Sequence, residues 1–384
     1  MKKAKRMAGL LLACLMTATA LMSCSSDEAE APPVIVDTGS AQTDNSSATV
    51  ASTVEEEPEP VKAEIPEGMY RSELTGLPID EALKNQRPIA VMVDNEVMAL
   101  DHFGIAEADI LYEMINSTAN DRITRLMPVY KDWKSVDQIG NVRSARSTNM
   151  MIYPEYDAVL MHAGGPFYIN DYLNTGFNPR INGDFTRIPN GKPSEFTLYI
   201  KNSVKSLESL FQTYNLSEEY TEHHEEGDHF LFVEYGEEVD QSGTDWKEVS
   251  AVDMSAAFKH NKSRLVYNEE TTSYDYEEYG RLHVDGEDEE VATFENAFLI
   301  RASMSQLDAN GYMVYNMYVG EPTEAYYLTN GKMKEVYWQK TGPQDAIKFF
   351  EKDTSGKYVP MAINSGKTYI GIIPADYWDG IIFE

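Results

Sequence analysis

The chain has 384 residues, of which 63 are acidic and 32 are basic, and its formal net charge is −31 at pH 7. Nucleic acid and anionic lipid surfaces are excluded as electrostatic partners, because both select a basic face. The acidic residues concentrate in the N-terminal part, around 218–240 and around 269–290. Such runs fit solvated surface or loose binding of divalent cations, and both interpretations stay open.

Residues 1–23 have the pattern of a bacterial lipoprotein signal peptide. Four basic residues precede an apolar run over 7–21, which is too short to span a bilayer as a mature anchor. The run ends in Leu21-Met22-Ser23-Cys24, which resembles the lipobox that is cut before its cysteine. We predict that Cys24 is lipidated, because two acyl chains give stable attachment to the cell membrane, here on its extracytoplasmic face. With Cys14 removed, the mature protein then has no free thiol and no disulfide.

Residues 24–68 are predicted to form a disordered acidic tether. They are rich in Ser, Thr, Ala, Glu and Pro, as in Glu55-Glu56-Glu57-Pro58, and contain few large apolar side chains. Such a composition cannot offset the conformational entropy of ordering. The tether would hold the folded part away from the membrane.

Residues 69–245 are predicted to form an N-terminal α/β domain, because short apolar strands alternate with helical spacing. Polar residues follow several of these strands, and ligands bind at the carboxyl ends of strands in open α/β sheets. Helices are expected over 144–153 and 203–214. The expected strands cover 88–93 before Asp94-Asn95, 110–112 before Glu113, 123–130, and 158–161 before His162.

Residues 246–384 are predicted to form a mainly antiparallel, β-rich C-terminal domain, which makes the fold class α+β. Short β-branched and aromatic runs lie at 263–267, 297–301, 312–318 and 368–373. Asn330-Gly331, between two such runs, is the signal of a tight hairpin. We expect no strong helix in this segment.

Several motifs resemble the YerB family of bacterial lipoproteins, whose biochemical function is not established. The resemblance covers nearly everything after the tether and implies a two-domain envelope lipoprotein without supplying a reaction. The chain departs from the family pattern at 119–122, at Asn141 and at Pro166. The matching pieces include Arg87 to Asn95, Ala108 to Glu113, Arg122 to Arg125, Ile139 to Arg146, His162 to Gly165, Tyr279 to Arg281, Asn296 to Leu299 and Asn364 to Thr368.

Four arginines in a short span are candidates for binding an anion. Arg143 and Arg146 are three residues apart at the expected start of a helix, where guanidinium groups and free N–H groups could clamp a carboxylate or phosphate. Arg122 and Arg125 lie upstream, at the entry to a strand. The alternative, equally open, is a structural ion network with Asp94, Asp109, Glu113 and Asp121.

His162 follows an apolar strand and precedes two glycines. With Asp94 and Glu113 at neighbouring strand ends it could act as a general base or a metal ligand, although a lone histidine in such a place is more often structural. The ligand-binding candidates are Asp94, Asn95, Glu113, Arg122, Arg125, Arg143, Arg146 and His162. We predict no bound metal and no cofactor.

The function predicted from these features is that of a membrane-anchored, extracytoplasmic lipoprotein of the cell envelope that binds an anionic small molecule or wall component. One alternative is an envelope hydrolase that uses Asp94, Glu113 and His162. Another is a scaffold that docks a protein through aromatic residues of its second domain, among them Tyr326, Tyr327, Tyr337 and Trp338.

Overall fold

The structure is a computed structural model that describes residues 63–221 and 229–384. The predicted signal peptide, Cys24 and nearly all of the predicted tether lie outside the described residues, as does the acidic segment 222–228. The described residues belong to one compact unit, 60–384. None of the described helices is both long and apolar enough to cross a membrane.

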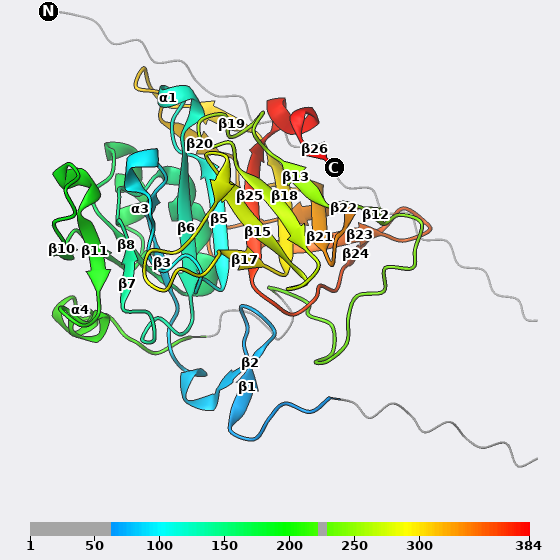
Figure 1. The fold of residues 1–384 in the computed structure, drawn as a ribbon, viewed down its shortest axis with the longest axis horizontal. Coiled ribbons are helices and arrows are strands. Elements are labelled where there is room, and N and C mark those ends of the chain that lie inside the picture. Colours follow the sequence, from blue (N-terminus) through cyan, green and yellow to red (C-terminus); the bar gives the residue numbers. More distant parts are fainter. Residues whose placement is uncertain (1–62, 222–228) are drawn as a thin grey trace, which may run out of the picture. The chain divides into compact units, whose positions relative to one another are not determined.

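Strands dominate both halves of the described chain (Figure 1). The first half contains β1 (Met69–Arg71), β2 (Pro78–Asp80), β3 (Ile89–Val91), β4 (Val93–Asp94), β5 (Ile110–Ile115), β6 (Thr124–Tyr130), β7 (Gln138–Gly140), β8 (Val159–His162), β9 (Arg180–Asn182), β10 (Thr186–Arg187) and β11 (Leu198–Lys201). The second half contains β12 (Lys247–Glu248), β13 (Ala251–Asp253), β14 (Arg264–Asn268), β15 (Ser273–Glu278), β16 (Arg281–Leu282), β17 (Thr293–Phe294), β18 (Asn296–Ala302), β19 (Met304–Gln306), β20 (Met313–Tyr315), β21 (Thr323–Thr329), β22 (Lys332–Gln339), β23 (Lys348–Lys352), β24 (Tyr358–Pro360), β25 (Thr368–Pro374) and β26 (Ile382–Phe383).

The helices are short. The α-helices are α1 (Ala119–Arg122), α2 (Ser147–Ile152), α3 (Asn170–Leu173) and α4 (Leu207–Thr213). Short 3₁₀ segments are η1 (Glu81–Leu83), η2 (Val97–Ala99), η3 (Tyr153–Tyr156), η4 (Phe167–Ile169), η5 (Ser194–Phe196) and η6 (Ala375–Gly380). As expected, the described residues after 246 contain no α-helix.

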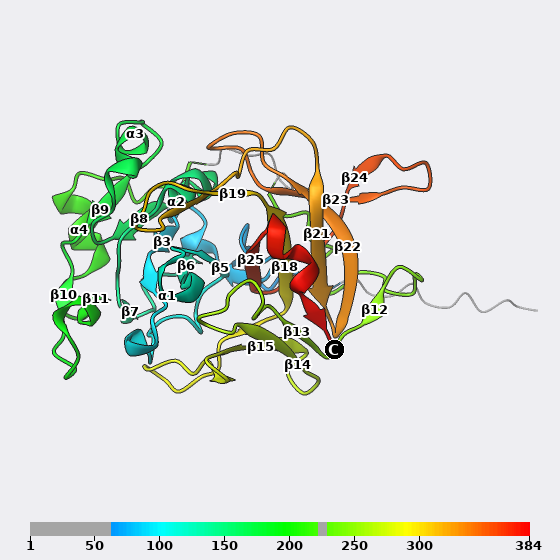
Figure 2. The same cartoon turned by 90° about the horizontal axis from the view of Figure 1, so that it is seen from above.

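A 13-stranded mixed sheet runs through both halves of the chain, in the order β24-β23-β22-β21-β18-β25-β5-β6-β3-β8-β9, with β12 beside β22 and β4 beside β6. Strand β25, from the second half, pairs in parallel with β18 on one side and with β5, from the first half, on the other. Figure 2 shows β18, β25 and β5 side by side. The sheet therefore joins the N-terminal and C-terminal segments without a break.

The buried strands at the centre of this sheet explain the long apolar runs of the sequence. Every residue of β3, β5, β6 and β25 is buried, so both faces of the sheet are covered and the usual apolar-polar alternation is lost. A six-stranded antiparallel sheet, ordered β16-β15-β14-β13-β26 with β17 beside β15, is built from the second half. Pairing in the first half is mixed, since β3 is parallel to β8 but antiparallel to β6.

The tight hairpin predicted at Asn330-Gly331 is confirmed. Thr329 pairs with Lys332 across the β21–β22 turn, and Asn330 and Gly331 have φ values of 49° and 70°. Positive φ at both central residues is the requirement of a type I′ turn. A Cβ at Gly331 would also lie 2.7 Å from the ring of Tyr267.

Several predicted elements differ from the structure at their ends. The helix expected from 144 begins at Ser147, and Pro154 lies in the 3₁₀ turn that follows it. The helix expected from 203 begins at Leu207, because Ser206 caps it by accepting a hydrogen bond from Ser209 N. Strand β20 covers only three residues of the run expected over 312–318.

Candidate functional site

The carboxyl ends of three strands of the first half lie at one edge of the large sheet. Strand β3 is parallel to β8, and both β3 and β5 are antiparallel to β6, so β3, β5 and β8 point the same way while β6 begins at that edge. The segment between β7 and α2 crosses this edge. Arg143 N donates to Met92 O at 2.8 Å, and Ala163 N donates to Arg143 O at 2.8 Å. The backbone thus holds Arg143 between the ends of β3 and β8.

Asp94 is the centre of an arginine cluster at this edge. Its Oδ1 lies 3.2 Å from a terminal nitrogen of Arg125, and its Oδ2 lies 2.6 Å from Nε of Arg143. Asp94 and Arg125 are buried, whereas the side chain of Arg143 is 29% exposed and also reaches Glu195 at 3.2 Å. We call Asp94, Arg125, Arg143 and Arg146 the arginine cluster.

The ionisation of Asp94 depends on its arginines. Burial opposes the charged form, but Arg125 and Arg143 outweigh it and hold the pKa of Asp94 below its usual value. Burial lowers the pKa of Arg125, and Asp94 opposes that change. The Asp94–Arg125 contact is therefore a buried ion pair, and Arg143 also pairs with Asp94, so the ion network predicted from the sequence as the structural alternative includes these three residues.

Arg146 differs from the other two arginines, because its contacts are to neutral groups. Its Nη1 donates to the carbonyl oxygens of Ser144 and Ala145 at 3.3 and 3.0 Å, and its guanidinium lies 4.7 Å from the ring centre of Tyr312. Within the described residues it forms no ion pair with a carboxylate. Burial, followed by repulsion from Arg125, lowers the pKa of Arg146 to about 9. Asp94 opposes this change from a longer distance.

Contrary to the prediction that Glu113 follows the end of a strand, it lies inside β5. It pairs with no arginine among the described residues. Its carboxylate accepts hydrogen bonds from four hydroxyl groups, and burial raises its pKa to about 7. The donors are Thr124 at 2.7 Å, Ser263 at 2.6 Å, Tyr276 at 3.0 Å and Tyr369 at 2.7 Å. Three of them come from the second half of the chain, so this network fastens the two halves together.

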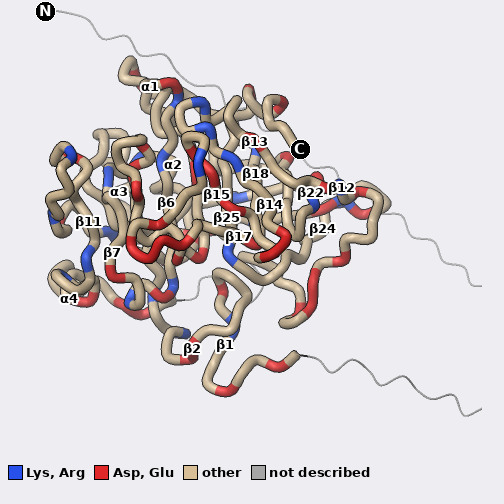
Figure 3. The backbone as a smooth tube through the Cα atoms, in the orientation of Figure 1, with Lys and Arg blue, Asp and Glu red and all other residues tan. Residues whose placement is uncertain are grey.

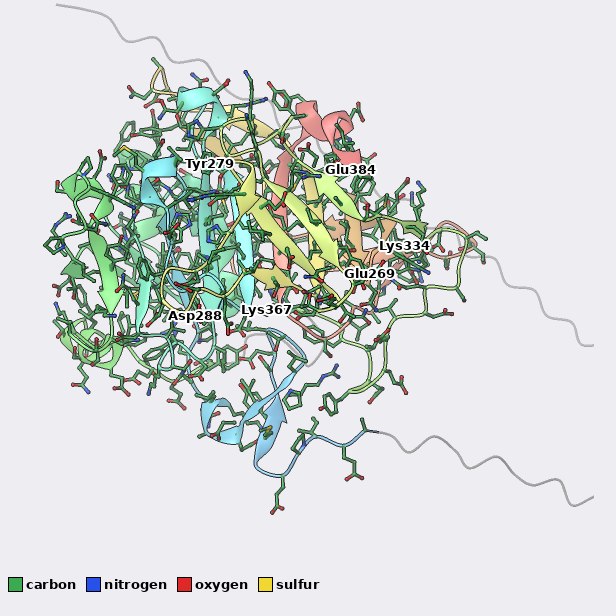
Figure 4. The ribbon with its side chains drawn as sticks, viewed as in Figure 1. Glu269, Tyr279, Asp288, Lys334, Lys367 and Glu384 are labelled. Atoms are coloured by element: carbon green, nitrogen blue, oxygen red, sulfur yellow. The ribbon has the colours of Figure 1, made fainter. Side chains whose placement is uncertain are left out.

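Asn95 belongs to the same polar interior. Its side-chain amide donates to Thr124 Oγ1 at 2.8 Å, and its backbone carbonyl oxygen accepts from the Asn261 side-chain amide at 2.7 Å and from the Tyr279 hydroxyl at 2.6 Å. Tyr279 is labelled in Figure 4, at the turn after β15. Asn95 is fully buried. Its contacts are those of a structural residue.

Arg122 and His162 point to other partners. Arg122 lies 3.8 Å from the ring centre of Tyr377 and donates to Ala256 O at 2.6 Å. His162 Nδ1 lies 2.8 Å from Gly164 O, and burial lowers its pKa, so the ring is neutral at pH 7. The backbone places His162 beside Arg143, but its side chain contacts no member of the arginine cluster.

The contacts give the two alternative functions no support. Asp94, Glu113 and His162 have separate sets of partners, and among the described residues no hydrogen bond or ion pair joins them. Among the aromatic residues considered for docking, Tyr327 and Trp338 are fully buried. Tyr326 stacks on Trp378 with ring centres 4.6 Å apart. These aromatic residues pack within the fold.

The sequence analysis missed the partners that the second half supplies. Ser263, Tyr276 and Tyr369 are 150, 163 and 256 residues from Glu113 in the sequence. No local pattern distinguishes them from other strand residues. Figure 3 shows acidic positions spread over most of the described chain, which also gives no sign of one buried carboxylate.

Each half of the chain matches a separate protein-family model. Models described as the N-terminal and C-terminal domains of a protein of unknown function (DUF3048) match residues 74–222 and 253–370. The "Putative lipoprotein YerB" of Bacillus subtilis (strain 168) is 24% identical over 316 residues, covering 79% of this chain and 86% of that protein. The crystal structure of YerB from Bacillus subtilis superimposes with a TM-score of 0.66 at 21% identity, covering 82% of this chain and 99% of that chain.

Proposed function

The chain belongs to the YerB (DUF3048) family and has its two-domain α+β fold, and we propose that it is a membrane-anchored lipoprotein of the cell envelope that binds an anionic ligand. The anchor would be the lipid on Cys24, and the folded part would face outward from the membrane. The ligand would be a small molecule or a wall component that carries a carboxylate or a phosphate. Residues 69–245 would form the N-terminal α/β domain predicted from the sequence.

The lipid anchor is supported by the N-terminal sequence and by the name of the Bacillus subtilis relative, which describes a lipoprotein. Changing Cys24→Ala removes the acceptor of the lipid, so palmitate labelling should be lost and the protein should leave the membrane fraction or stay unprocessed. Cys14→Ala is the matched control, because that cysteine departs with the signal. Unchanged labelling of the Cys24→Ala protein would contradict the anchor.

The observation that carries the proposed ligand is the imbalance of charge in the arginine cluster. Two guanidinium groups pair with one buried carboxylate, and a third, that of Arg146, has no carboxylate partner among the described residues. Arginine binds carboxylate and phosphate through paired N–H groups. Burial is the main cause of the lowered pKa of Arg146, and repulsion from Arg125 and Arg143 adds to it; an anion between Arg143 and Arg146 would offset both effects. Both side chains are partly exposed, so such an anion can reach them.

The test is a titration of the full mature chain with inorganic phosphate at low and high salt. The double change Arg143→Gln and Arg146→Gln should lower the affinity at least tenfold, while the parent should bind more weakly as salt increases. Asp94 keeps Arg125 in this variant, so the fold should survive. A phosphate-bearing wall polymer, titrated in parallel, distinguishes a polymeric ligand from a free one by its tighter binding.

Two further variants sharpen this test. Arg264→Gln is a matched control, because Arg264 is 31% exposed and pairs with two carboxylates, Glu277 and Glu384, but lies outside the cluster. Its phosphate affinity should equal that of the parent. Glu195→Gln removes a 54% exposed carboxylate that competes for Arg143, so phosphate should bind severalfold more tightly. Equal affinities for all these proteins would contradict an anion site at the arginine cluster.

A further inference from the structure

A second cluster of buried side chains lies outside the arginine cluster and takes no part in the proposed function. His102 lies in the loop between η2 and β5, Glu278 ends β15, and His283 follows β16. The turn at Tyr279 and Gly280, with φ values of 54° and 73°, folds β16 back on β15 and brings Glu278 and His283 together. The cluster joins one residue of the first family region to two of the second.

The backbone fixes this arrangement. Gly286 N donates to His102 O at 2.7 Å, and His283 N donates to Tyr276 O at 2.8 Å. Asp285 Oδ2 accepts from Ile105 N at 2.8 Å. The loop that carries His102 is therefore tied to the hairpin that carries Glu278 and His283.

The three side chains present possible ligand atoms to a common point. One ligand atom from each lies within 4.8 Å of the others. His283 Nδ1 is 2.9 Å from Glu278 Oε1, and His102 Nδ1 is 3.9 Å from the same oxygen. Ligands bound tetrahedrally to Zn²⁺ at its usual bond lengths are roughly 3.4 Å apart. Side-chain movements of about an ångström would close the cluster around an ion.

Several polar atoms of this cluster are buried without a well-formed hydrogen bond. They are both ring nitrogens of His102, Nε2 of His283 and Oε2 of Glu278. Asn95 and Asn261 lie near Glu278, and the backbone of Asp94 lies near His102, but in poor hydrogen-bond geometry. An unsatisfied buried polar group destabilises the fold. If the cluster were purely structural, the hydrogen bond between His283 and Glu278 would be its only internal contact of that kind, and the burial of these four atoms would have no explanation.

We propose that His102, Glu278 and His283 form a binding site for a divalent transition-metal ion, with Zn²⁺ the best match. Two imidazoles and one carboxylate are a common ligand set for Zn²⁺, and three protein ligands leave a coordination position open. The ion would take the place of the proton now shared between His283 Nδ1 and Glu278 Oε1, with His102 Nδ1 as the third ligand atom.

The surroundings suit a cation. Asp94, Asp101 and Asp285 act electrostatically on the two histidines, and Arg281 is the opposing charge, with a side chain that is 56% exposed.

A pocket gives access to the cluster. Its volume is about 330 Å³, and Glu278 and His283 form part of its wall together with Leu100, Asp101, Arg281, Leu282 and Val284. This space can admit the ion and then hold a water molecule or a small ligand at the open coordination position.

The experiment is a calorimetric titration of the full mature chain with Zn²⁺. The protein carries His223→Gln and His224→Gln, because these two histidines lie in the acidic run around 218–240, for which loose cation binding stayed open. We expect one Zn²⁺ per chain.

The double change His102→Gln and His283→Gln should weaken that binding at least tenfold. His260→Gln is the matched control, because His260 also faces one carboxylate, Glu96 at 3.5 Å, but lies outside the cluster; its titration should match the parent.

Cobalt provides a measurement that needs no variant. Co²⁺ bound by two histidines and a carboxylate with four ligands gives strong visible absorption, which Zn²⁺ should abolish by displacement. Failure of the parent to bind one Zn²⁺, or undiminished binding by a folded double variant, would overturn the proposal. Should the double variant fail to fold, absence of the Co²⁺ absorption in the parent would overturn it equally.

Discussion

Replacing Glu113 with Gln is expected to remove a pH-dependent cost of folding. Glu113 is fully buried, and burial raises its pKa from 4.5 to about 7. Between these values the folded protein keeps a proton on Glu113 that the unfolded chain has released. The unfolding free energy therefore falls as the pH rises from 4.5 to about 7, and this contribution is constant at higher pH.

The size of the effect follows from the two pKa values. At roughly 1.4 kcal/mol per pH unit, the interval from 4.5 to about 7 corresponds to about 3 kcal/mol. The Gln side chain has nearly the shape of a protonated Glu and no proton to lose. Tyr276 and Tyr369 can turn their hydroxyls to accept from its amide, so the hydrogen-bond network can persist. The difference in stability between variant and parent should thus move in the variant's favour as the pH rises.

The assay is urea unfolding of both proteins between pH 4.5 and 8. Asp109 and Glu107, whose pKa values burial raises to about 7, affect parent and variant alike, so they cancel in the difference. Glu335→Gln is the control, because Glu335 is 69% exposed, and its curve should parallel that of the parent. A constant difference between the Glu113→Gln protein and the parent would show that Glu113 is charged in the fold and refute the reasoning.

Two other changes test the packing of the second half. Lys340→Met should destabilise the fold by about 3–5 kcal/mol in urea unfolding, because it removes the ammonium group that lies 2.8 Å from the buried carboxylate of Glu155; a loss below about 1 kcal/mol would contradict this. Gly331→Ala should lower the melting temperature, because a Cβ would lie 2.7 Å from the ring of Tyr267 at a φ of 70°. Gly356→Ala is the control, since its φ is also positive but nothing lies within 4 Å. Equal decreases in melting temperature for both variants would show that backbone strain alone causes the loss, and would contradict a clash with Tyr267.

Local patterns predicted those parts of the fold that neighbouring residues determine. Asn330-Gly331 specifies its own turn, and the apolar run at 88–93 became the buried strands β3 and β4. Glu113 was misplaced for a physical reason. In a strand buried on both faces the run shows no alternation, so a charged residue after Tyr112 looks like the end of the strand.

The candidate site was predictable only where one stretch of sequence brings its members together. The span that contains Arg125, Arg143 and Arg146 was identified because four arginines stand out in so acidic a chain. The residues of the other family region that contact these side chains were not identified from the sequence. Tyr312 packs on Arg146, and Glu278 meets His102, only because strands distant in sequence pair in the folded protein. Hydrogen bonds that close over such separations leave no periodic signal.

The most direct test of the proposed function is a crystal structure of the protein soaked with tungstate, an anion whose metal is visible by anomalous scattering. We predict a peak within hydrogen-bond distance of the guanidinium groups of Arg143 and Arg146, with Arg125 still paired to Asp94. The peak should disappear in the Arg146→Gln protein. A fully occupied anion elsewhere on the protein, with none at the arginine cluster, would contradict the account.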